Sequence, residues 1–79
     1  MNRKPSAKYY KDEQLLADIG AKIRALREGK KQSQEAFAND MGVDYSQINR
    51  MELGKVNFSI SNLCRIAKAL GVDPKKLLP

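Results

Sequence analysis

The sequence predicts an all-α domain built from five short helices. Apolar residues recur at spacings of three and four, glycines fall at the ends of these periodic segments, and no segment shows the alternation typical of a strand. Because the chain has 79 residues, we expect a single compact domain, spanning residues 12–79. Residues 1–11 are basic, contain Pro5 and lack helical periodicity, so we expect a flexible N-terminal arm there.

The first helix is predicted from Asp12 to Gly29. Asp12 is a good N-cap residue, Arg27 falls in the last turn, and Gly29 is expected to end the helix. The apolar stripe that would face the core consists of Leu15, Leu16, Ile19, Ile23 and Leu26.

The second helix is predicted to begin after Ser33, a good N-cap residue, and to break at Gly42. Its inner face would carry Phe37, Ala38 and Met41. The third helix follows at once.

Asp44 is expected to cap the third helix, which runs from Tyr45 to Leu53 and ends at Gly54. Its inward apolar residues are Ile48 and Met51, whereas the rest of its first two turns is polar. A helix so polar on one side must face solvent or a polar partner there.

The fourth helix is predicted after Ser59 and before Gly71. Its apolar side consists of Ile60, Leu63, Ile66, Ala67 and Leu70. Asp73 and Pro74 then form an N-cap and a first-turn proline, which predict a short fifth helix over the sequence KKLL.

The composition excludes several classes of function. Fifteen Lys and Arg against nine Asp and Glu give a net charge of +6, and a small domain this basic attracts polyanions such as nucleic acid. The chain has no histidine and a single cysteine, Cys64, which we expect to be a packed or half-buried thiol. A Ser-His-Asp or Cys-His site, a structural zinc site and an internal disulfide are therefore not available. We expect no enzyme activity, no metal and no cofactor.

The stretch from Gln34 to Leu53 carries the pattern that indicates function. Two short helices are joined by a tight turn at Gly42, where a positive φ is expected, and the small Ala38 would let them cross closely. Val43, Ile48 and Met51 would hold the second of them to the core. This arrangement is a helix-turn-helix.

An ordered set of motifs resembles the Cro and phage-repressor (XRE-like) helix-turn-helix family. The matching pieces, within residues 17–78, are Ile23-Arg24-x-Leu26-Arg27, Ser33-Gln34-Glu35-x-Phe37-Ala38, Gly42-Val43, Ile48, Glu52-x-Gly54-Lys55 and Leu63-x-x-Ile66-Ala67-x-Ala69-Leu70-Gly71-Val72. The resemblance implies a compact five-helix, lambda-repressor-like DNA-binding domain whose helix-turn-helix is formed by helices 2 and 3. It also implies a homodimer that binds a palindromic site.

The third helix would then lie in the major groove and read base edges. The expected base contacts are Tyr45, Ser46, Asn49 and Arg50. Arg50 can donate two hydrogen bonds to guanine, and Asn49 is suited to adenine. The alternative is that these residues form only a solvated helix face.

Contacts with DNA phosphates are expected outside the base-reading face. They are assigned to Gln34, Gln47, Lys55 and Asn57, with Gln34 helped by backbone N–H groups at the start of its helix. The resemblance implies that Arg27 and Glu52 form a structural ion pair, with direct DNA contact as the alternative for Arg27. Leu53 departs from the family pattern, which often has a polar or basic residue there.

The dimer interface is expected at the C-terminal end of the chain. Its candidate residues are Leu70, Val72, Leu77 and Leu78. The cations of the N-terminal arm would either follow phosphates or a minor groove, or serve only as a solubilising tail.

We therefore expect a cytoplasmic, sequence-specific regulator of transcription that binds double-stranded DNA as a homodimer. It would associate with the nucleoid when bound to DNA, and we expect no membrane contact and no small-molecule ligand. Stand-alone regulators of this size include restriction–modification controllers and small phage repressors, which the compact chain favours. The alternatives are an antitoxin or another protein-interaction module of the same fold, and an RNA-binding or general nucleic-acid coat protein.

Overall fold

The computed structural model describes residues 11–79, which form four α-helices and one short 3₁₀ helix, with no strand among them. The elements are α1 (Glu13–Gly29), α2 (Gln34–Met41), α3 (Tyr45–Glu52), α4 (Ile60–Leu70) and the 3₁₀ helix η2 (Pro74–Leu77). The all-α fold is thus confirmed. The predicted basic arm lies outside the described residues, except for Lys11.

The short fifth helix predicted after Asp73 is present as a 3₁₀ helix and not as an α-helix, so the domain has four α-helices and one 3₁₀ turn. The Asp73 side chain accepts a hydrogen bond from the Lys75 backbone N–H, and Pro74 occupies the first turn, as the sequence predicts. The backbone hydrogen bonds join residues three positions apart. The Lys76 N–H donates to the Asp73 carbonyl at 2.9 Å, and the Leu78 N–H donates to the Lys75 carbonyl at 3.2 Å. Leu78 then turns to an extended conformation and ends the turn.

Side-chain caps begin three of the four α-helices. Asp12, Ser33 and Ser59 each accept a hydrogen bond at 3.0 Å from the backbone N–H three residues ahead. Asp44 occupies the N-cap position of α3, but its side chain makes no capping bond. The start of α3 is therefore fixed by its packing and by the turn before it.

α1 ends at Gly29, as predicted, and the left-handed backbone conformation that follows falls on Lys31, with φ of 57°. Gly42 and Gly71, by contrast, adopt left-handed conformations directly after α2 and α4.

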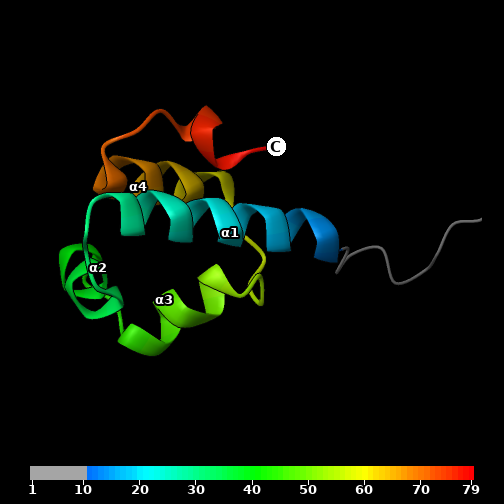
Figure 1. Ribbon diagram of the computed structural model, residues 1–79. Helices are drawn as coiled ribbons and strands as arrows, with labels where there is room; N and C mark the ends of the chain where they lie inside the picture. The colour runs from blue at the N-terminus through cyan, green and yellow to red at the C-terminus, as the bar shows by residue number, and fades with distance from the viewer. Residues whose placement is uncertain (1–10) are drawn as a thin grey trace, which may run out of the picture.

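The helices form two groups on either side of α1 (Figure 1). α2 and α3 lie on one side, and α4 with η2 lies on the other. Contacts between α2 and α4 close the arrangement around one core.

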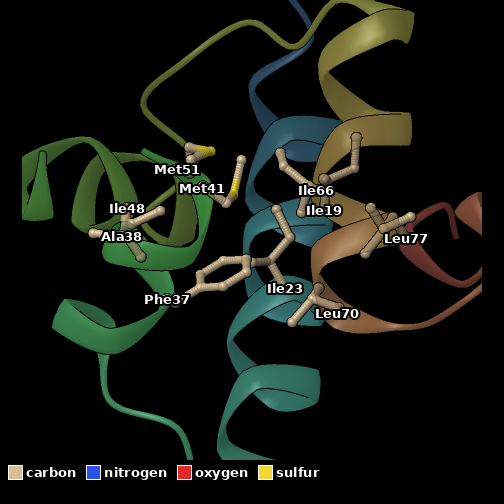
Figure 2. Packing of buried hydrophobic residues seen from close by; sticks show 11 residues of the cluster. Ile19, Ile23, Phe37, Ala38, Met41, Ile48, Met51, Ile66, Leu70 and Leu77 are labelled. Carbon is tan, nitrogen blue, oxygen red and sulfur yellow. The ribbon is translucent and has the colours of Figure 1, made fainter. Parts of the chain in front are cut away.

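Each of the five elements contributes a fully buried side chain to the core (Figure 2). These residues are Ile23, Phe37, Ile48, Ile66 and Leu77. Because the core joins every element, the position of α3 depends on the whole domain. No helix in the described part of the chain is long and apolar enough to cross a membrane.

Candidate nucleic-acid interface

The α2–α3 turn has the geometry of a helix-turn-helix. Gly42 adopts φ of 69°, a left-handed conformation that glycine allows without a steric penalty. The Val43 backbone N–H donates to the Ala38 carbonyl at 3.0 Å, which satisfies the end of α2. Ala38 is buried at the crossing of the two helices, so its small side chain permits their close approach.

α3 has one buried face and one exposed face. Ile48 and Met51 face the core, with 0% and 7% of their surface exposed. Tyr45 is half exposed, at 52%, and Ser46 and Arg50 are also exposed. Three of the four expected base-contact residues therefore share the open side of the helix. The fourth, Asn49, is partly buried at its edge.

The back of α3 lies directly against the backbone of α1. A Cβ atom added to Gly20 would stand 2.5 Å from the Met51 carbonyl oxygen and 2.6 Å from that of Glu52. Gly54 has φ of 73°, and a Cβ there would stand 2.7 Å from the Ala17 Cα. Gly20 had no predicted role, and its one signal in the sequence is that a glycine inside a helix lowers helix propensity.

A buried ion pair joins α1 to the end of α3. Arg27 Nε donates to Glu52 Oε2 at 2.6 Å, and Arg27 Nη2 donates to Glu52 Oε1 at 3.0 Å. The two side chains are only 8% and 2% exposed. The hydrogen bond to Glu52 raises the pKa of the Arg27 guanidinium, against the opposing effect of burial. Arg27 also donates to the Gln32 carbonyl at 2.7 Å, so the loop between α1 and α2 is hydrogen-bonded to the same ion pair.

Gln34, expected to contact a phosphate, instead directs its amide group into the protein. Its Nε2 donates to Glu52 Oε1 at 2.9 Å and makes a longer bond to Asn49 Oδ1 at 3.5 Å. Both amide hydrogens are then directed at protein acceptors. A phosphate contact at this place remains a prediction, and the backbone N–H groups at the start of α2 are the better donors for it.

The other expected phosphate contacts lie on α3 and in the loop that follows it. Gln47, Lys55 and Asn57 are all exposed. Gln47 and Asn57 line one cavity of about 250 Å³ together with Asn62 and Arg65, two polar residues of α4 that had no predicted role. Arg65 also donates a hydrogen bond to the Met41 carbonyl at the end of α2.

The expected dimer residues divide into two kinds. Leu70 and Leu77 are 3% and 0% exposed and belong to the core of the single chain, so they have no surface to offer a partner. Val72 is half buried, and Leu78 is 45% exposed. Among the described residues the most exposed large apolar side chain is Ile60, at 80%.

The described residues contain no group of three or more Asp, Glu, Cys or His side chains placed to hold a metal ion. Cys64, expected to be packed or half-buried, is exposed on α4. That prediction was wrong, because Cys64 lies two positions before the buried Ile66 and so points to the other side of the helix.

Comparison with known proteins agrees with this geometry. Residues 23–77 match the model of the helix-turn-helix family. The control protein C.BamHI of Bacillus amyloliquefaciens is 42% identical over 61 residues, which are 76% of this chain and 75% of that protein. A hypothetical transcription factor of Neisseria meningitidis is 37% identical over 68 residues, 85% of this chain and 64% of that protein. The crystal structure of the restriction–modification controller C.AhdI from Aeromonas hydrophila superimposes with a TM-score of 0.74 at 36% identity, covering 80% of this chain and 96% of that one.

Proposed function

Because this chain belongs to the helix-turn-helix family of DNA-binding transcriptional regulators, we propose that it binds an inverted repeat in double-stranded DNA as a homodimer. We also propose that it acts as a controller of the kind found in restriction–modification systems. The similarity to two proteins named as controllers supports this choice over a phage repressor or an antitoxin.

One observation carries the proposal, namely the open face of α3. Tyr45, Ser46 and Arg50 project from a helix whose other side is fixed in the core. An α-helix presented in this way fits the major groove, where each base pair shows a distinct pattern of donors and acceptors. Arg50 would form the main contact, two hydrogen bonds to guanine O6 and N7.

Contacts with the DNA backbone would orient the recognition helix. We assign these to the start of α2 and to Gln47, Lys55 and Asn57, and we add Asn62 because it shares a cavity with Gln47 and Asn57. The net charge of +6 would attract DNA before the specific contacts form. Binding should therefore weaken steeply as the salt concentration rises.

A homodimer is needed because one recognition helix reads only a few base pairs. Two such helices about 34 Å apart would read two half-sites on one side of the duplex. We place the interface on Ile60 and Leu78, with Val72 as a further candidate, because these residues keep exposed apolar surface that the core does not use.

Selection of bound sequences from a random duplex library tests the proposal, with Arg50→Ala run in parallel. We expect the wild type to select an inverted repeat. We expect Arg50→Ala to lose the preference for one guanine in each half-site of that repeat. The matched control is Lys68→Ala, because Lys68 is an exposed cation of α4 that lines neither the hollow beside Tyr45 nor the cavity beside Gln47. Binding that is sensitive to salt but selects no sequence would overturn the operator proposal and leave a non-specific binder or a partner-binding module.

A further inference from the structure

The chain of hydrogen bonds from Arg27 to Asn49 has a fixed direction. The Glu52 carboxylate is buried, pairs with Arg27, and is a pure acceptor when ionised. Gln34 must therefore present its NH₂ group, and not its oxygen, to Glu52, as it does at 2.9 Å. The ion pair thus determines which way the Gln34 amide is turned.

The same NH₂ group determines the orientation of Asn49. The second amide hydrogen of Gln34 points toward Asn49, which accepts it through Oδ1 at 3.5 Å. Since the two polar atoms of a carboxamide branch in different directions from Cγ, Asn49 Nδ2 points away from Gln34. Asn49 is partly exposed and lines an open hollow of about 520 Å³ beside Tyr45. Its donor group is thus the one left for an external partner.

We propose that Gln34 is a positioning residue that limits Asn49 to the role of a hydrogen-bond donor toward DNA. This inference rests on the proposed function. In the major groove guanine offers two acceptors and thymine one, cytosine offers only an amino donor, and adenine sets an amino donor next to its single acceptor, N7. Asn49 would therefore favour guanine or thymine. The two-bond contact with adenine expected from the sequence needs Oδ1, which is bonded to Gln34.

The experiment is selection from a random duplex library with four proteins: the wild type, Asn49→Ala, Gln34→Met and the control Gln14→Met. Gln14 is an exposed glutamine of α1 that bonds only to Asp18 among the hydrogen bonds of the described residues. The base position that is selected by the wild type but not by Asn49→Ala is the position that Asn49 reads. Duplexes carrying each of the four base pairs at that position then give relative affinities for each protein.

We expect the wild type and Gln14→Met to favour guanine or thymine at that position by about tenfold over adenine. In Gln34→Met, Asn49 is free to turn, so adenine should be accepted as well and the discrimination should fall several-fold. A loss of folding alone would lower affinity for all four duplexes equally. The change in base preference is therefore the readout that a merely structural role would not produce.

Three results would overturn the inference: adenine preferred by the wild type, an unchanged preference in Gln34→Met, or no position altered by Asn49→Ala. Absence of any selected sequence for the wild type would contradict the proposed function itself. If Gln34→Met fails to fold, Asn49→Asp tests the donor role of Asn49 on which the inference depends, because a carboxylate only accepts. Its preference should then move from guanine or thymine to cytosine or adenine, and retention of guanine or thymine would overturn the inference.

Discussion

The two faces of α3 are held in different ways. The inner face is fixed by core packing through Ile48, by the ion pair at Glu52 and by close contact with the α1 backbone at Gly20, which has no side chain. The outer face, with Tyr45 and Arg50, makes no comparable contribution to the fold. Stability and recognition are therefore separable on a single eight-residue helix, and substitutions on its two sides should affect different measurements.

The strongest test of the inner face is Glu52→Gln, which removes the buried partner of Arg27 and leaves, among the described residues, only the exposed Glu28 near its charge, at 3.9 Å. We expect a loss of about 3–5 kcal/mol in the free energy of unfolding, measured by urea denaturation. The double variant Arg27→Met with Glu52→Gln should recover part of this loss, because it removes the unpaired charge. Equal stability of the single variant and the wild type would show that the pair does not hold α3.

A second test compares two residues that are two positions apart on α3. Ile48→Ala removes a fully buried side chain and should lower the free energy of unfolding by about 2–5 kcal/mol. Arg50→Ala should change it by no more than about 0.5 kcal/mol, since Arg50 is exposed. Thermal unfolding of both variants checks the difference. A large loss in Arg50→Ala would mean that the outer face also supports the fold.

A third test concerns the contact between the α1 and α3 backbones. Gly20→Ala places a methyl group within 2.5 Å of the Met51 carbonyl oxygen, so α3 must shift. We expect a loss of about 1–3 kcal/mol on urea denaturation, together with weaker DNA binding. Gly29→Ala is the matched control, because no atom lies within 4 Å of its added Cβ, and its stability should be unchanged or slightly higher. If both variants behave alike, the close approach is not a constraint.

These comparisons also show why the sequence revealed some features and not others. Local signals located the helices well, because caps such as Ser33 and Ser59 act through bonds within three residues. The role of Gly20 was missed because it depends on carbonyls more than thirty positions away, which no local pattern encodes. Leu77 looked like a surplus apolar residue, yet it closes the core.

The candidate site shows the same division between local and distant information. Helical periodicity placed Tyr45, Ser46 and Arg50 on the open face of α3. The orientation of the Gln34 amide could not be predicted, because it is determined by a carboxylate on another helix. Family resemblance supplied the partners Arg27 and Glu52, but it did not supply this third bond.

The smallest expected effect on stability concerns the hydrogen bond by which α4 contacts the end of α2. α2 has no basic residue in its last turn, and Arg65 of α4 donates instead to the Met41 carbonyl there. Arg65→Met should therefore lower the free energy of unfolding by about 1 kcal/mol, because a charge-assisted bond to a helix end is lost. Lys68→Met, on the same helix and also exposed, is the control and should cost about 0.5 kcal/mol or less.

The binding assay decides whether Arg65 acts on the fold alone. Arg65 shares a cavity with Gln47 and Asn57, so a shift of the α2 end would move residues that we assign to the DNA backbone. We expect Arg65→Met to weaken binding to all duplexes by a similar factor while the selected base preferences stay the same, since phosphate contacts carry no sequence information. A changed base preference would mean that α4 positions the reading face of α3 directly, and the separation between its two faces would then be incomplete.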